Sequence, residues 1–280
     1  MARRKVSLKE IEDIRARLWR TAPTRQIAGE SGAVRFIREL GFVLLMPISG
    51  AELPSLHRAT RDPWSWWDWK QTLPGRKACY YGKLLRRRGT FVSWDWYPFF
   101  HAAYAERRSY RRLYHDGLLS REEKLILDLL ADRGPLMTGN IRLAFGAPSK
   151  QNTRRAKSLL VDLQTRFLIT AAGGSTKGWS HHRWDLVERW VPARHLARAQ
   201  SIAPEEARRK LVAQFCRNMH VTTAADIAWL FGWGRAEVDG TVAGLLEAGD
   251  LECARAPELG GDVLVYARRR ARAAPQAPRG

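Results

Sequence analysis

The sequence predicts a mainly α-helical protein with small β wings, built from tandem winged helix-turn-helix domains. Residues 120–192 and 203–267 follow the same plan of elements. Each stretch begins with a helix of apolar periodicity, continues with a short helix and a longer third helix, and ends in two β-rich pieces around a glycine-containing loop. A chain of 280 residues is also long for one core, so two or three domains are expected.

Basic residues dominate the composition, with 48 Lys and Arg against 28 Asp and Glu and a formal net charge of +20. They are dense in residues 83–88, 107–112 and 268–272. Such runs favour a phosphate-binding surface, since an anionic membrane would call for an amphipathic helix with an aromatic stripe. From the first two runs we expect contacts by five side chains: Arg86, Arg87, Arg88, Arg107 and Arg108. Residues 268–280 are expected to form a disordered basic tail.

Several classes of protein are disfavoured. No apolar run is long enough for a membrane span, and Met1–Lys9 lacks the apolar core of a secretion signal. The three cysteines are widely spaced, which argues against disulfides and zinc and fits a reducing cytoplasm. The pair His181-His182 lacks companions for a metal site. We therefore expect a cytoplasmic, nucleoid-associated monomer without cofactor or metal.

Residues 1–119 are expected to form a helical, winged-helix-like region. Helices are predicted at 7–20, where Ser7 and Glu10 can cap, and at 31–40, where Gly41 can end the helix. A tryptophan-rich segment follows, at positions 64, 66, 67, 69, 94 and 96. The alternation in 91–96 suits a strand with one buried face, and we interpret these tryptophans mainly as core. The alternative is that one or two of them stack on an unpaired base.

The stretch 120–192 carries the clearest helix signals. Ser120 and Glu123 form a capping box, Thr138 can cap the second helix, and Ser149 can cap the third. The third helix begins with polar and basic side chains that can reach phosphates and base edges. We expect DNA contacts from Lys150, Gln151, Asn152, Arg154, Arg155 and Lys157, and from Lys177 in the glycine-rich wing.

The stretch 203–267 repeats the plan with a different third helix. Thr223 and Asp226 open its second helix, and Gly232 and Gly234 make the turn. The third helix starts Arg-Ala-Glu-Val-Asp at 235–239, which is poor in base-reading cations. We therefore expect this stretch to brace the protein or to touch DNA only marginally.

Two segments read RWDLVERWVP at 183–192 and TTAADIAWLFG at 222–232. With two shorter segments, they resemble the AlkZ/YcaQ-like winged-helix DNA glycosylases. Residues 183–192, RWDLVERWVP, resemble the family's Y-D-L-x-E-R-x-x-P, and residues 222–232, TTAADIAWLFG, resemble P-A-T-x-x-D-x-A-x-W-x-G. Gly134-Pro135-Leu136 resembles its G-P-L. Residues 40–43, LGFV, followed by 55–61, SLHRATR, resemble the segment that carries the active site. The resemblance implies a concave, basic array of winged helices that embraces duplex DNA, and in active members it implies removal of alkylated or crosslinked purines.

The family's catalytic element is Gln, an aliphatic residue, then Gln or Asp, directly after this LGFV-like segment. The three positions read Leu44-Leu45-Met46 in this chain. Glycosidic cleavage needs a polar group that positions water and stabilises positive charge, which Leu and Met cannot supply. We therefore expect a protein that binds double-stranded DNA, alkylated or distorted, without cutting it. Two alternatives stay open: a glycosylase with a relocated carboxylate, Glu52 or Asp62, and a winged-helix transcription regulator.

Overall fold

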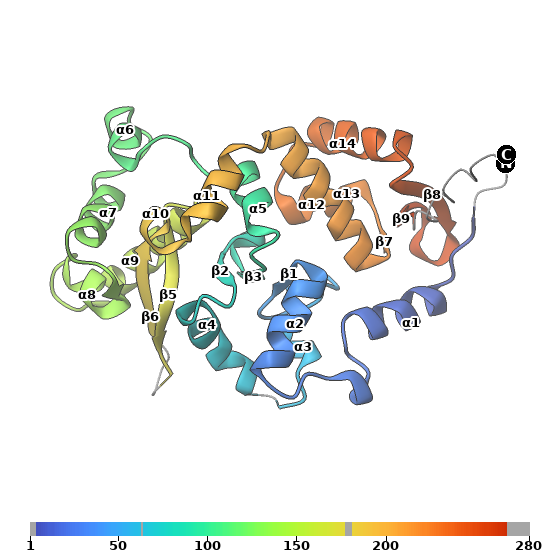
Figure 1. Ribbon diagram of the computed structural model, residues 1–280, viewed down its shortest axis with the longest axis horizontal. Helices are drawn as coiled ribbons and strands as arrows, with labels where there is room; N and C mark the ends of the chain where they lie inside the picture. The colour runs from blue at the N-terminus through green and yellow to red at the C-terminus, as the bar shows by residue number, and fades with distance from the viewer. Residues whose placement is uncertain (1–3, 63, 177–180, 268–280) are drawn as a thin grey trace, which may run out of the picture. The chain divides into compact units, whose positions relative to one another are not determined.

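The computed structural model describes residues 4–62, 64–176 and 181–267. Lys177 and the expected tail 268–280 lie outside the described residues. The described residues form two compact units, one within residues 16–208 and one that combines residues 4–15 with 209–267. Figure 1 colours the elements in chain order.

Within the described residues, three segments share one order of elements: helix, strand, helix, helix, strand, strand. The N-terminal repeat consists of α2 (Glu30–Leu40), β1 (Phe42–Leu44), α3 (Leu56–Ala59), α4 (Ser65–Gly75), β2 (Tyr80–Lys83) and β3 (Gly89–Val92). The central repeat consists of α7 (Arg121–Arg133), β4 (Leu136–Met137), α8 (Thr138–Leu143), α9 (Lys150–Thr165), β5 (Ile169–Ser175) and β6 (His181–Leu186). The C-terminal repeat consists of α12 (Pro204–Met219), β7 (Val221–Thr222), α13 (Ala224–Phe231), α14 (Arg235–Glu247), β8 (Leu251–Ala256) and β9 (Gly261–Tyr266).

Other helices precede, join or follow these segments. They are α1 (Leu8–Leu18), α5 (Tyr97–Tyr104), α6 (Tyr110–His115), α10 (Val187–Trp190) and α11 (Ala193–Gln200). Short 3₁₀ turns occur at Pro23–Arg25, Leu85–Arg87 and Pro257–Leu259.

Each repeat closes with a three-stranded antiparallel sheet in which the last strand lies in the middle. The orders are β1-β3-β2, β4-β6-β5 and β7-β9-β8. The predicted fold class, mainly α with small β wings, is confirmed. The N-terminal repeat has the same strand order as the central and C-terminal repeats, although its sequence shows the pattern of helices and strands less clearly.

Local capping explains why several helices begin where the sequence predicts. The Ser120 hydroxyl accepts a hydrogen bond from the Glu123 backbone N–H at 3.1 Å, and the Glu123 carboxylate accepts from the Ser120 N–H at 2.8 Å. Ser149 caps α9 through the Asn152 N–H at 3.0 Å. These bonds satisfy backbone donors that a helix start leaves without partners.

Two local predictions are wrong. Thr138 does not cap α8, because its hydroxyl donates to the His182 carbonyl at 3.0 Å and accepts from Trp184 Nε1 at 2.9 Å. The strand predicted over 91–96 ends at Val92, and all of β3 is buried rather than one face. In both places tertiary neighbours outweigh the local pattern.

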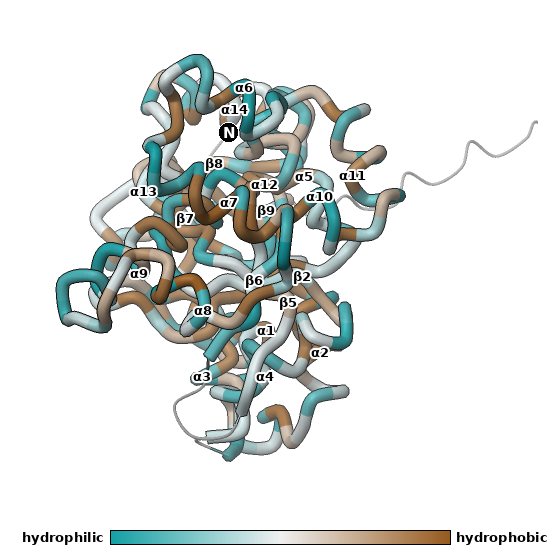
Figure 2. The backbone as a smooth tube through the Cα atoms, turned by 90° about the vertical axis from the view of Figure 1, so that its left-hand side faces the viewer, coloured by the Kyte–Doolittle hydropathy of each residue, from teal (hydrophilic) through white to brown (hydrophobic). Residues whose placement is uncertain are grey.

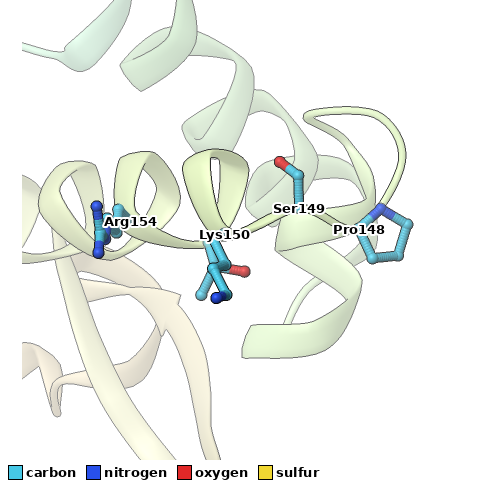
Figure 3. A pocket seen from close by; sticks show the side chains of 5 residues that line it. Pro148, Ser149, Lys150 and Arg154 are labelled. Carbon is cyan, nitrogen blue, oxygen red and sulfur yellow. The ribbon is translucent and has the colours of Figure 1, made fainter.

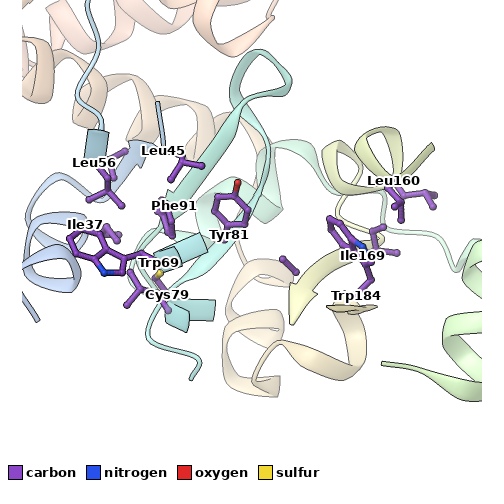
Figure 4. Packing of buried hydrophobic residues seen from close by; sticks show 14 of the residues in the cluster. Ile37, Leu45, Leu56, Trp69, Cys79, Tyr81, Phe91, Leu160, Ile169 and Trp184 are labelled. Atoms are coloured by element: carbon purple, nitrogen blue, oxygen red, sulfur yellow. The ribbon is translucent and has the colours of Figure 1, made fainter. Parts of the chain in front are cut away.

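The main hydrophobic core is one cluster with residues from both the N-terminal and the central repeat, part of which Figure 4 shows. Trp69 and Phe91 from the first and Leu160 and Trp184 from the second belong to the same cluster. Among the predicted core tryptophans, Trp66 is buried as well, whereas Trp94 and Trp96 are half-buried. Two remain on the surface, namely Trp64 at 75% exposure and Trp67 at 37%. The core interpretation therefore holds for only part of the tryptophan-rich segment.

Candidate nucleic-acid interface

The start of α9 presents a cluster of exposed cations. Lys150, Arg154 and Lys157 are exposed, while Ala156 and Leu160 lie buried on the opposite side of the helix. This division follows from the apolar periodicity of the helix. The first turns therefore offer positive side chains beside free helix N–H groups, an arrangement that favours phosphate.

A shallow cavity of about 450 Å³ lies at the N-terminus of α9. Figure 3 shows the side chains of Lys150 and Arg154 along this part of the helix, next to the Pro148-Ser149 turn. Thr153 completes the lining. The hollow is open and lined by two cations, so it can receive a phosphodiester without desolvating them fully.

Three other predicted contacts on α9 differ in their surroundings. Asn152 donates two hydrogen bonds from Nδ2, to the carbonyls of Phe145 and Ala147, each at 3.0 Å. Its side chain thus holds the turn before the helix. Arg155 pairs with Glu122 at 2.7 Å, which offsets its charge. Gln151 is exposed.

The structure brings the arginine run 86–88 next to α9. Arg86, Arg87 and Arg88 are exposed at the tip of the β2–β3 hairpin, and Arg87 pairs with Asp162 of α9 at 2.5 Å. On the adjoining strand, burial lowers the pKa of Lys83, and the nearby charges of Arg88 and Lys157 lower it further. Cations more than 60 residues apart in sequence therefore form one surface, which we call the α9 face: Lys150, Arg154, Lys157, Arg86, Arg87 and Arg88.

The second arginine run is engaged locally. Arg108 pairs with Glu106 at 2.8 Å and with Asp116 at 3.2 Å. Arg107 donates to the carbonyl of Ile202 at 3.1 Å. Both side chains are exposed, but neighbouring carboxylates compensate the Arg108 charge, so this run offers less net positive charge than the α9 face.

The third helix of the C-terminal repeat carries fewer available cations. Arg235 at its start pairs with Asp239 at 2.9 Å, and Glu237 lies in the same turn. The sequence predicts fewer DNA-contacting cations on α14 than on α9. The ion pair with Asp239 also offsets the charge of Arg235.

The three positions that the resemblance aligns with the family's catalytic element lie at the end of β1 and directly after it. Leu44 and Leu45 are buried, and the Leu45 N–H donates to the Gly89 carbonyl at 2.7 Å. Met46 is 45% exposed. Of the alternative carboxylates, Glu52 is exposed, and exposed Asp62 accepts a hydrogen bond from the Trp64 N–H at 3.0 Å. These three positions thus place no polar side chain at the end of β1.

A buried basic group that the sequence analysis missed lies beside this interface. Lys70 of α4 is only 5% exposed, and its Nζ lies 2.8 Å from the ring centroid of Trp67. Burial first, and then the Lys83 charge, lower the pKa of Lys70 to about 7, while Asp68 acts in the opposite direction. The helical pattern of α4 contains no sign of this, because the packing of β5 on α4 creates the burial.

The part of the chain that the structure describes lacks two further features. It contains no helix long and apolar enough to cross a membrane, and Figure 2 shows short hydrophobic stretches interrupted by hydrophilic ones. Nor does it contain a group of three or more His, Cys, Asp or Glu side chains placed to hold a metal ion.

Comparisons with known proteins agree with the resemblance in the sequence. The family model described as AlkZ related matches residues 27–232. Among solved structures, the chain is similar to the Streptomyces sahachiroi DNA glycosylase AlkZ, with a TM-score of 0.58 and 14% identity over 94% of this chain and 70% of that one. At this identity the likeness establishes a shared fold. No curated protein matches the sequence.

Proposed function

The chain belongs to the AlkZ-related family, and from this premise we propose that it binds double-stranded DNA and recognises alkylated or distorted sites without excising the base. The observation that carries the proposal is the α9 face. Its cations come from two repeats: Lys150 and Arg154 line an open hollow at the N-terminus of α9, and Arg87 pairs with Asp162 further along the same helix. Contacts of this kind supply most of the affinity of proteins for duplex DNA.

The second half of the proposal rests on Leu44, Leu45 and Met46, the positions that the resemblance aligns with the family's catalytic element. Hydrolysis of a glycosidic bond needs a group that positions water and stabilises the oxocarbenium-like charge. Leu44 and Leu45 are part of the core and Met46 is an exposed thioether, so none of them can do this. Uncharged side chains at this position still allow a base to be bound without cleavage of its glycosidic bond.

One incubation tests both halves of the proposal. Purified full-length protein is mixed with plain duplex and with duplex that contains N7-alkylguanine, and mobility shift and abasic-site formation are scored in the same samples. We expect tighter binding to the alkylated duplex and no base release beyond the spontaneous rate.

Two outcomes would contradict the proposal. Equal binding of both duplexes would leave only nonspecific phosphate contacts. Robust release of the alkylated purine would instead support the alternative of an active glycosylase. Loss of that release in Glu52→Gln or Asp62→Asn, with DNA binding intact, would identify the relocated carboxylate.

A further inference from the structure

Polar side chains are buried where α4 packs along β5 of the central repeat. Lys70 is 5% exposed and its neighbour Gln71 is 1% exposed. His182 of β6 adds an imidazole whose Nδ1 is inaccessible to solvent. The three residues come from two repeats of the same compact unit, so the fold assembles this cluster.

The cluster lacks internal hydrogen bonds. Among the residues that the structure describes, Gln71 Nε2, Gln71 Oε1 and His182 Nδ1 have no hydrogen-bond partner. Leaving such a group unsatisfied costs about 1–3 kcal/mol, so buried groups of this kind call for an explanation. Buried water would satisfy the amide and the imidazole. Water does not explain why a lysine is buried beside a second cation.

The electrostatics favour an uncharged amine. Burial, and to a smaller extent the charge of Lys83, lowers the pKa of Lys70 to about 7. Burial, Lys70 and Lys83 together lower the pKa of His182 to about 3. Asp68, on the same helix, raises the pKa of Lys70 and is the opposing charge. A desolvated lysine next to another cation is one of the known ways to activate an amine as a nucleophile.

The cluster is continuous with the α9 face. Lys83 interacts electrostatically with Lys70 on one side and with Arg88 and Lys157 on the other. The Lys70 Nζ lies directly over Trp67, whose side chain reaches the surface. Trp67 therefore lies between the amine and solvent, next to a surface suited to a sugar-phosphate backbone.

We propose that Lys70 is an amine nucleophile that condenses with the aldehyde of an abasic deoxyribose in DNA. This inference rests on the proposed function, because it requires DNA on the α9 face. Rotation of Trp67 away from Nζ opens the side of the amine that this ring covers, and the free indole face can stack on a neighbouring base. The protein would then act on the product that base-removing enzymes generate.

The condensation balances without a redox partner. The neutral Lys70 nitrogen adds to C1′ of the ring-opened sugar, and one amine proton passes to the former carbonyl oxygen. The resulting carbinolamine loses its hydroxyl group and the second amine proton as water, which leaves an imine between Nζ and C1′. Borohydride delivers hydride to C1′ and solvent protonates nitrogen, which converts the imine to a stable secondary amine.

Reductive trapping tests the proposal. Full-length protein is incubated with duplex that contains one preformed abasic site, DNA binding is measured by mobility shift, and borohydride is then added. We expect a covalent complex that maps to Lys70 after digestion and mass spectrometry. Its yield should rise with pH to a plateau just above 7, whereas adducts of ordinary lysines keep increasing towards pH 10. In Lys70→Arg the yield should fall at least about tenfold, since a guanidinium stays protonated.

Controls separate this inference from the proposed function. Lys77→Arg removes an exposed lysine that follows the same helix, and it should leave the yield unchanged. Mapping on the wild-type chain keeps the test valid if Lys70→Arg fails to fold. Binding without an adduct, or adducts only at other lysines, would overturn the role of Lys70 and leave DNA recognition intact. Absence of any binding would overturn both.

Discussion

Removing Lys150 and Arg154 together tests the α9 face most directly. Both side chains are exposed and line the same hollow at the start of α9. Each neutralised phosphate contributes about −0.9 to the slope of log K against log salt, so Lys150→Ala with Arg154→Ala should make the slope shallower by about 1.8. Over a fourfold rise in salt, the affinity advantage of the wild type should then shrink about tenfold. Fluorescence anisotropy with a labelled duplex at 50 and 200 mM salt measures this.

A matched control uses the equivalent helix of the C-terminal repeat. Arg235→Ala removes a cation from the first turn of α14, where Asp239 already offsets it. Its salt slope should stay within experimental error of the wild type. The assignment is refuted if Arg235→Ala weakens binding more than the double variant does. If neither protein differs from the wild type, the phosphate contacts lie elsewhere, first of all on the arginine run 107–112.

Three further predictions concern stability. Leu44→Gln should lower the free energy of unfolding by about 2–5 kcal/mol because it buries an amide in the core, whereas Met46→Gln should change it by about 0.5 kcal/mol or less. Urea denaturation measures both values, and equal losses would place both residues in the core. Asn152→Ala should cost about 1–2 kcal/mol through its two lost carbonyl contacts, and Gln151→Ala almost nothing; thermal melts of both variants compare them. The stability of the wild type relative to Lys70→Met should rise from pH 7 towards 10, because the unfolded chain keeps the Lys70 proton that the folded chain has lost; parallel curves for the two proteins would contradict the lowered pKa.

Local signals in the sequence predicted much of the central and C-terminal repeats. The capping box of Ser120 and Glu123 and the cap at Ser149 depend only on residues within one turn, so a sequence pattern is enough to locate them. The same holds for the box of Thr223 and Asp226. Thr138 shows the limit, since a distant partner, His182, uses its hydroxyl.

The candidate interface was predicted only in part. The cations of α9 follow from helical periodicity, but nothing in the sequence places Arg86–Arg88 beside Asp162. That arrangement needs the β2–β3 hairpin to pack near a helix of the next repeat. The missed Lys70 has the same cause, because an isolated α4 would leave its side chain in water.

The sequence by itself determined the capped starts of α7, α9 and α13, the excess of positive charge and the apolar residues at positions 44–46, since each depends on residue types close together along the chain. The tertiary structure decided which cations share a surface, which tryptophans are buried and which lysine loses its solvent. The physical reason is that burial and electrostatic neighbours arise from contacts between elements far apart in sequence. A sequence pattern therefore contains the local signals, whereas burial and electrostatic neighbours depend on how the repeats pack.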